Sequence, residues 1–264
     1  MSGVIAGHVD DFFWAGNEKF KKKIIDPIRK TFKISSDLQD SFRFLGLNVK
    51  QYSSYIELNQ ETYAKSIKAI DISNKKNKTR VLSVEEKDRL RSAIGQLSWL
   101  GNQSRPDISA NVCQLSGAYK DATVSDILLA NKTIKKVSAD NLSLYFPKLN
   151  LSELTIEVHS DASFKNLPNA GSQGGFIIFL CDNLGNATPI QWQARRIKRV
   201  VKSTLAAECL ALVDALDYAY YIKRIIDEVL GLPKDRTKIN CYIDCKSLHD
   251  VLHSSNNDRG CFSY

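Results

Sequence analysis

The order of apolar segments after residue 151 constrains the fold more than any other feature of the sequence. Strand-like runs at 155–159, 175–180 and 189–193 precede a long amphipathic helix at 203–230 and a further strand at 238–243. Strands joined by short turns form an antiparallel meander, and a helix between two strands makes a crossover. This order predicts a mixed sheet with helices packed against it.

The first part of the chain has a different pattern, which begins with two short strands interrupted by a pair of acids. We expect a hairpin there, with Asp10 and Asp11 at its tip. The other elements expected before residue 74 are a helix at 18–32, strands at 42–49 and 55–58 that form a hairpin around 51–54, and a helix at 60–70.

A basic, polar linker at 74–80 separates this region from three amphipathic helices. Ser83 and Glu86 have the spacing of a capping box and predict a helix start. Arg105, Pro106 and Asp107 should end that helix, and further helices are expected at 108–118 and 124–137. With the boundary near residue 148, the chain divides into three predicted units, residues 1–73, 74–148 and 149–264.

The composition predicts a folded chain and is compatible with a polyanionic partner. A length of 264 residues with 43% hydrophobic content supplies one large or two ordinary cores. The net charge of +8 favours a nucleic-acid partner, although scattered lysines could equally serve solubility.

The cysteines and the first residues of the chain indicate the cellular compartment. The six cysteines lie in apolar segments without a CxxC pair, which predicts free, buried thiols in a reducing compartment. No apolar run reaches the length of a membrane span, and the start lacks the order of a signal peptide. We therefore expect an intracellular protein of the cytoplasm or nucleus.

Three acids occupy positions where a buried sheet is not expected to hold them. Asp161 ends the first strand of the meander, Asp244 ends the last strand, and Glu208 lies on the helix between them. The helical stripe of Glu208 is apolar and contains no lysine or arginine nearby, so a metal ion is the simplest compensation for its charge. Three oxygen donors without a histidine or thiol favour Mg²⁺ or Mn²⁺ over zinc.

Each acid also has a structural interpretation. Asp161 could cap a turn, Asp244 could cap a helix that starts at Lys246, and Glu208 could reach solvent from the edge of its stripe. Their joint order on strand, helix and strand favours a shared site at the carboxyl ends of two neighbouring strands.

Short motifs in a fixed order resemble the polymerase polyproteins of copia-type retrotransposons over residues 2–253. The segments that resemble the ribonuclease H domain of these elements are 160–163 with 174–175, 203–211 and 242–248. Those that resemble the polymerase palm, thumb and connection are 8–11 with 15–16, 44–46, 94–100 and 104–109. The implied fold class is an α+β palm and thumb remnant followed by an α/β ribonuclease H-like domain.

The resemblance implies hydrolysis of the RNA strand of RNA–DNA hybrids with two divalent ions, Mg²⁺ or Mn²⁺. By motif position, Asp161 would bridge the two ions, while Glu208 would bind one and Asp244 the other. RNA, DNA and other parts of the retroelement polyprotein are the implied partners.

Two departures from the family weaken these implications. The family has a fourth acid on a final helix, whereas residues 256–264 do not resemble that motif and Asp250 and Asp258 have other surroundings. We therefore expect a C-terminally truncated domain with an incomplete two-metal site. In the family, fingers and a first palm aspartate precede Asp10 and Asp11, so we expect polymerase activity to be lost.

A basic cluster directly before the Glu208 helix is the candidate phosphate contact. Its members are Arg195, Arg196, Lys198, Arg199 and Lys202. The alternative is that these charges only solvate a turn. Two functions therefore remain open, a hybrid-specific ribonuclease and an inactive retroelement remnant that at most binds nucleic acid.

Overall fold

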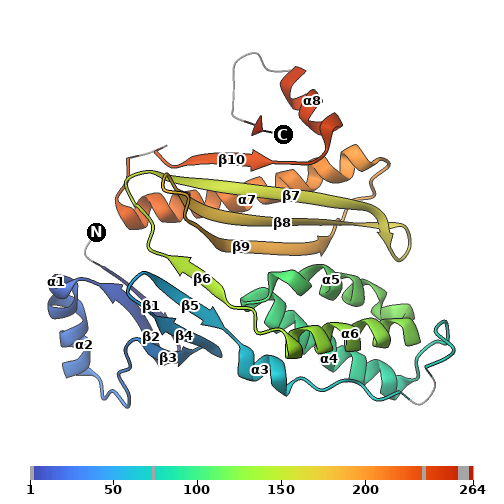
Figure 1. The fold of residues 1–264 in the computed structure, drawn as a ribbon, viewed down its shortest axis with the longest axis horizontal. Coiled ribbons are helices and arrows are strands. Elements are labelled where there is room, and N and C mark those ends of the chain that lie inside the picture. Colours follow the sequence, from blue (N-terminus) through green and yellow to red (C-terminus); the bar gives the residue numbers. More distant parts are fainter. Residues whose placement is uncertain (1–2, 73–74, 234–235, 255–261, 264) are drawn as a thin grey trace.

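The computed structural model describes residues 3–72, 75–233, 236–254 and 262–263, which form a mixed α+β fold (Figure 1). The first half contains β1 (Gly3–His8), β2 (Asp11–Gly16), α1 (Glu18–Phe20), a π-helical turn (Lys21–Ile25), α2 (Asp26–Thr31), β3 (Ser41–Phe44), β4 (Leu47–Gln51), β5 (Tyr55–Asn59), α3 (Glu61–Ser66), α4 (Val84–Gln103), α5 (Ser109–Ala118) and α6 (Val124–Ala139). The second half contains β6 (Leu144–Pro147), β7 (Leu154–Leu167), β8 (Gly171–Asp182), β9 (Ala187–Arg196), α7 (Thr204–Leu230), β10 (Lys238–Tyr242), α8 (Lys246–Ser254) and β11 (Phe262–Ser263).

The N-terminal hairpin forms as predicted. Strands β1 and β2 pair antiparallel from Gly3 opposite Gly16 to His8 opposite Asp11, and Val9 turns the chain with a φ of 56°. The helix expected at 18–32 is interrupted by the π-helical turn. This turn brings Ile25 to the buried side five residues after Phe20, while Phe32 stays 59% exposed.

Strands β3, β4, β5 and β6 form an antiparallel sheet in that order. The expectation of one strand over residues 42–49 was wrong, because Leu45 and Gly46 have φ values of 49° and 80° and fold the segment into a tight hairpin. Two consecutive residues with positive φ match the right-handed twist of paired strands. The predicted hairpin between β4 and β5 is confirmed.

Helix α3 ends at Ser66, earlier than the predicted end at residue 70. The following segment runs into the helical bundle, where Ile67, Ile70 and Ile72 are buried in its core. Asn131 of α6 exchanges two hydrogen bonds with the backbone of Ile70, at 2.7 and 2.8 Å, and so satisfies backbone groups that a helix would have paired internally.

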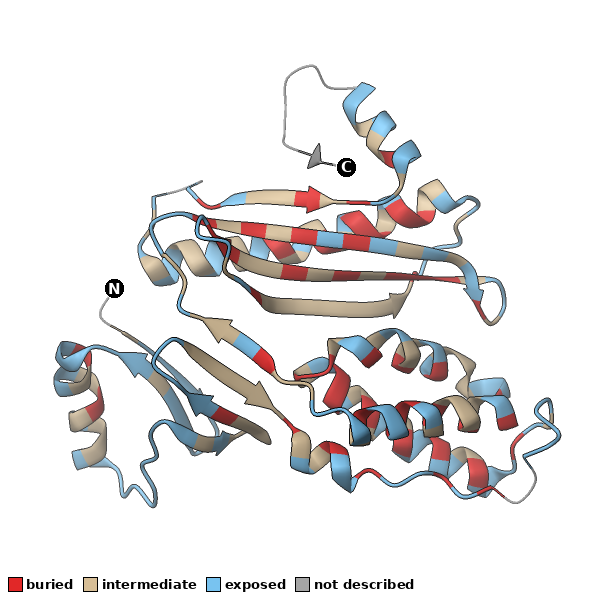
Figure 2. Cartoon of the chain, viewed as in Figure 1, coloured by how far each residue is buried: buried red, intermediate tan, exposed pale blue. Residues whose placement is uncertain are grey.

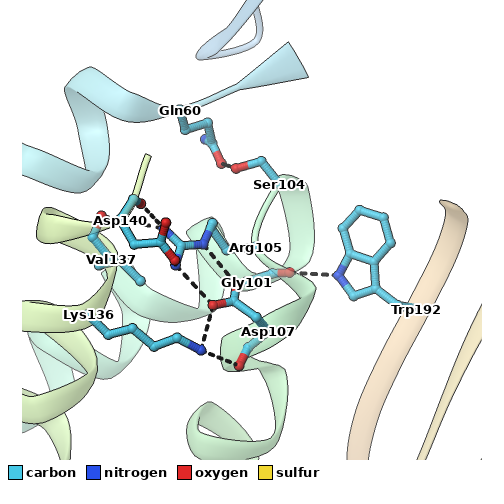
Figure 3. Close-up of polar contacts among 9 residues, drawn as sticks. All are labelled: Gln60, Gly101, Ser104, Arg105, Asp107, Lys136, Val137, Asp140 and Trp192. Carbon is cyan, nitrogen blue, oxygen red and sulfur yellow. Dashed lines mark hydrogen bonds and ion pairs between the residues drawn. The ribbon is translucent and has the colours of Figure 1, made fainter. Parts of the chain in front are cut away.

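Helices α4, α5 and α6 pack around a continuous apolar core, which appears as buried stripes in Figure 2. The predicted capping box is present, since Glu86 and Ser83 exchange hydrogen bonds at the start of α4. At the other end of α4, the guanidinium of the buried Arg105 pairs with Asp107 and donates to the carbonyl of Asp140 at 2.8 Å (Figure 3). This contact joins the end of α4 to the end of α6.

The second sheet has five strands in the order β11, β10, β7, β8, β9, with α7 packed on one face (Figure 1). Strands β7, β8 and β9 form the predicted antiparallel meander, and β10 lies parallel to β7. Strand β7 does not end at Asp161 as expected but continues to Leu167, because residues 160–163 keep their pairing with β8.

The division into units at residues 73 and 148 stays a prediction. Strand β6 lies within the predicted second unit yet pairs with β5 of the first, from Tyr55 opposite Pro147 to Leu58 opposite Leu144. Where the chain is described, none of its helices combines the length and apolar character that a membrane span needs.

Candidate metal centre

Glu208 lies in the second turn of α7, the helix that covers the second sheet. Ser203 caps the helix by accepting a hydrogen bond from the backbone of Ala206, which fixes where the helix begins. Leu212 and Ala215, four and seven residues after Glu208, are buried against the sheet. Glu208 therefore faces inward and is only 4% exposed, so it does not extend to solvent as the structural interpretation required.

Asp161 and Asp244 reach the same place from two neighbouring parallel strands. Strands β7 and β10 remain paired up to His159 opposite Tyr242, and each acid lies two residues beyond that pair. Carboxylate oxygens of Asp161, Glu208 and Asp244 all lie within 4.8 Å of one another. We call these three residues the acidic triad. Asp161 is within a strand and caps no turn there, which excludes its structural interpretation.

The early end of β10 leaves room for Glu208 beside β7. Beyond His159, the described part of β10 offers β7 no partner, and the backbone amide of Ala162 instead lies close enough to the Glu208 carboxylate to favour its ionised form. One carboxylate oxygen of Glu208, Oε2, is buried without a hydrogen-bond partner among the described residues. A buried acceptor of this kind is costly unless a ligand satisfies it.

The electrostatics of the triad also point to a bound cation. Burial, and then the charges of Asp161 and Asp244, raise the pKa of Glu208 to about 7. Three carboxylates this close repel one another when all are ionised, and a divalent cation removes that repulsion. The donors are all carboxylate oxygens, which fits a hard cation such as Mg²⁺ or Mn²⁺.

The basic cluster lies at the end of β9 and in the connection to α7. Lys198, Arg199 and Lys202 are exposed in this connection, immediately before the helix that carries Glu208. Arg195 instead donates a hydrogen bond of 3.1 Å to Asp214 of α7 and forms an ion pair with it at 2.6 Å, which ties β9 to that helix. Arg196 ends β9, with its guanidinium beside Gly171. The phosphate-binding role of the cluster stays a prediction.

The remaining candidate acids are not members of the triad. Asp10 lies in the exposed hairpin turn and Asp11 begins β2, so the tip carries both, as expected. Their assignment to a polymerase remnant without activity stays a prediction. Asp250 is exposed on α8, while Asp258 lies outside the described residues.

The cysteines that the structure describes are free thiols, as predicted, but only Cys181 and Cys241 are buried, while Cys113 and Cys245 are half-buried and Cys209 is exposed. Cys261 falls outside the described residues.

The sequence does not reveal the contribution of the Ala162 amide. A main-chain donor has no residue-type signal, and its availability depends on where β10 stops. The predicted strand at 238–243 is shorter than β7, and this difference in length leaves the Ala162 amide unpaired by β10.

Comparison with known proteins identifies the class of protein. The chain superposes on a foamy viral protease-reverse transcriptase, solved in complex with an RNA/DNA hybrid, with a TM-score of 0.51 and 16% identity, covering 97% of this chain and 32% of that one. No protein-family model matches the sequence. This chain therefore shares its fold with part of that protease-reverse transcriptase.

The sequence relatives narrow this class. The chain is 27% identical over 215 residues to a transposon Ty5-1 protein of Saccharomyces cerevisiae, covering 75% of this chain and 67% of that protein. It is 25% identical over 249 residues to the Pol polyprotein of transposon RE1 of Arabidopsis thaliana, covering 88% of this chain but only 16% of the polyprotein. The chain is a homologue of the Pol polyproteins of Ty/copia-type retrotransposons, and the resemblance seen in its sequence is confirmed.

Proposed function

We propose that the part of the chain from residue 149 onward is a ribonuclease H-like domain that cleaves the RNA strand of RNA–DNA hybrids. The observation that carries this proposal is the acidic triad, whose carboxylate oxygens lie within 4.8 Å of one another and include a buried oxygen of Glu208 that has no partner among the described residues. The structural neighbour was solved with an RNA/DNA hybrid, which supports the choice of substrate. Residues before 149 would form the palm and thumb remnant.

The triad would hold divalent ions, and the residues present fit them. Asp161 and Asp244 are exposed and open to a substrate, while the buried Glu208 supplies the inner ligand. Divalent ions in such a site supply an activated water and stabilise charge on the departing 3′ oxygen. The chain itself contributes the orientation of the ligands, because Glu208 is held on the buried side of α7 with its Oε2 atom lacking any partner among the described residues.

The exposed cations before α7 would position the substrate. Lys198, Arg199 and Lys202 lie next to the start of the helix that carries Glu208, where phosphates of a bound duplex would approach. Arg195 would act indirectly, since its ion pair with Asp214 anchors β9 to α7 and so supports this connection.

The alternative is a protein that binds nucleic acid and cleaves nothing. The observation that favours it is the raised pKa of Glu208, about 7, because protons compete with a metal ion for a ligand that titrates near neutrality. Binding through the basic cluster would not depend on the triad.

Cleavage of an end-labelled RNA–DNA hybrid distinguishes the two functions. We expect the purified chain to cut the RNA strand in Mg²⁺ or Mn²⁺. The cleavage rate of Asp161→Asn should be at least about 100-fold lower, because the loss of one group that stabilises transition-state charge typically lowers kcat by that factor. Asp217→Asn, an exposed acid of the same helix α7, is the matched control and should retain activity.

A second readout separates metal binding from catalysis. A metal ion at ten times its Kd should add about 1.4 kcal/mol to the free energy of unfolding of the wild-type chain and so raise its melting temperature. The melting temperature of Asp161→Asn should rise less. A folded chain that binds the hybrid but leaves it intact in both metals would contradict the nuclease proposal and favour the alternative.

A further inference from the structure

The sheet formed by β3, β4, β5 and β6 has two unlike faces. On one face, Phe42 and Phe44 of β3 contact Phe13 of the N-terminal hairpin, with ring centroids 5.8 and 5.3 Å apart. Val49 is opposite Phe42 in the register and is buried, while Phe42 and Phe44 are half-buried. Since side chains alternate along a strand, the intervening residues lie on the opposite face.

Three tyrosines gather on that opposite face. Tyr52 and Tyr55 are stacked with ring centroids 4.6 Å apart, and Tyr145 of β6 meets Tyr55 edge-on at 5.6 Å. Tyr52 remains 44% exposed and Tyr145 remains 54% exposed. We call this side of the sheet the tyrosine face.

A hydrogen-bond network fixes the arrangement of the tyrosine face. The carboxylate of Glu57 accepts hydrogen bonds from Ser143 at 2.7 Å, from Asn59 at 3.3 Å and from the hydroxyl of Tyr52 at 3.4 Å. Tyr145 is the direct cross-strand neighbour of Glu57. The only acid among these residues is thus occupied by donors from the sheet, and the rings are held in place before any ligand arrives.

The same face carries positive charge. Lys50 is the cross-strand partner of Glu57, so one row across three strands reads Lys50, Glu57 and Tyr145. Arg43 is opposite Asn48, which places it two residues further along the same face. Both cations are exposed. Aromatic rings flanked by cations on an open sheet form the kind of surface on which unpaired bases stack while cations contact phosphates.

We propose that the tyrosine face binds single-stranded nucleic acid, with unpaired bases stacked on Tyr145 and on the Tyr52–Tyr55 pair. Lys50 and Arg43 contact the phosphate backbone. This site does not include the acidic triad or the basic cluster before α7, so it stands independently of the nuclease proposal.

Cross-strand packing alone does not account for the tyrosines. Rings whose role is to fill space between strands lose most of their surface to neighbours, whereas Tyr145 keeps more than half of its surface. The neighbouring sheet reaches the backbone of Tyr145, where the hydroxyl of Thr188 donates to the Tyr145 carbonyl at 3.4 Å. The ring is thus left on the surface beside that contact.

Fluorescence anisotropy with labelled oligothymidylate tests the proposal on the full chain. We expect Tyr145→Ala to weaken binding roughly 5- to 150-fold, the range that corresponds to about 1–3 kcal/mol per stacked base, while Tyr145→Phe binds nearly as well as wild type. The matched control is Tyr220→Ala with Tyr221→Ala, because these tyrosines are 58% and 65% exposed on α7, away from the sheet.

The salt dependence separates stacking from charge. Lys50→Gln should reduce the slope of log affinity against log salt by about 0.7, whereas Tyr145→Ala should leave the slope unchanged. Photocrosslinking to halogenated uracil should label the peptide that contains Tyr145 or the one that contains Tyr52 and Tyr55.

Two results would overturn the proposal. One is a folded Tyr55→Ala, Tyr145→Ala double variant that binds the oligonucleotide as tightly as wild type, and the other is a set of crosslinks confined to other peptides. Hybrid cleavage by the same double variant shows separately whether the nuclease proposal holds.

Discussion

At the scale of single residues, Glu208 carries most of the functional argument. It is buried, one of its oxygens has no partner among the described residues, and its pKa is raised to about 7 by burial and by the neighbouring acids. A folded-state pKa above the unfolded value means that the native protein holds its proton more tightly between about pH 4.5 and 7. The metal-free protein should therefore lose stability as the pH rises through this window.

Glu208→Gln removes the ionisable group and should abolish that loss. In chelator at pH 8 the variant should be more stable than wild type by about 1–3 kcal/mol, since each pKa unit corresponds to about 1.4 kcal/mol and solvent screens part of it. At pH 5 the two proteins should differ little. Urea unfolding at both pH values measures the effect, with the exposed Glu228→Gln of the same helix as control. A pH-independent difference would contradict the raised pKa.

The sequence predicted which acids matter but not how they are held. Residue type and order along the chain were enough to select Asp161, Glu208 and Asp244, which meet within 4.8 Å. The position of Asp161 inside β7 and the Ala162 amide were missed, because both depend on how far two strands pair rather than on any side chain.

At the scale of elements, close packing of α7 on β8 sets the position of the triad. A Cβ at Gly174 of β8 would lie 3.2 Å from the Cβ of Ala211 and 3.5 Å from Ile197. Glycine thus allows the helix to approach the sheet closely near the turn that carries Glu208. Helical periodicity predicted α7, but the closeness of this contact could not be read from it.

Gly174→Val should push α7 away from the sheet. We expect a loss of about 1–3 kcal/mol in the free energy of unfolding, the usual cost of overpacking a filled interior. Gly95→Ala provides the opposite control, because no atom of the described residues lies within 4 Å of its added Cβ on the exposed side of α4. Alanine should stabilise that helix by about 0.5–1 kcal/mol. Denaturant midpoints measure both changes. An unchanged midpoint for Gly174→Val would contradict the expectation, because it would show that α7 can shift to accommodate the valine without loss of stability.

Turn chemistry and tertiary contacts explain the elements that the sequence missed. The segment 42–49 reads as one apolar strand, and only the left-handed conformations of Leu45 and Gly46 divide it. The segment after Ser66 has helical periodicity, yet Asn131, distant in the sequence, holds the backbone of Ile70 in another conformation. Local patterns cannot report a competing partner some sixty residues away.

At the scale of the whole molecule, two apolar cores are joined by a small number of polar contacts. One core lies within the helical bundle and the other between α7 and the second sheet. The shortest of the contacts between them is the hydrogen bond of 2.7 Å from the indole N–H of Trp192 on β9 to the carbonyl of Gly101 on α4 (Figure 3). Gln173 adds a longer hydrogen bond, of 3.4 Å, to the carbonyl of Ala110. Together with the packing of α5 and β6 against β9, these contacts hold the second sheet, and with it the triad, against the helical bundle.

Trp192→Phe keeps an aromatic ring between the two cores but removes the donor. Because Gly101 is buried, its carbonyl loses its partner, and we expect the junction to weaken by about 1–3 kcal/mol. The loss should appear as faster amide hydrogen exchange at the end of α4 and along β9, and as two thermal transitions where the wild type shows one. Trp99→Phe, a tryptophan of α4 that is 43% exposed, should change neither. Unchanged exchange in Trp192→Phe would mean that apolar packing alone couples the two cores, because the hydrogen bond would then add nothing that the ring does not supply.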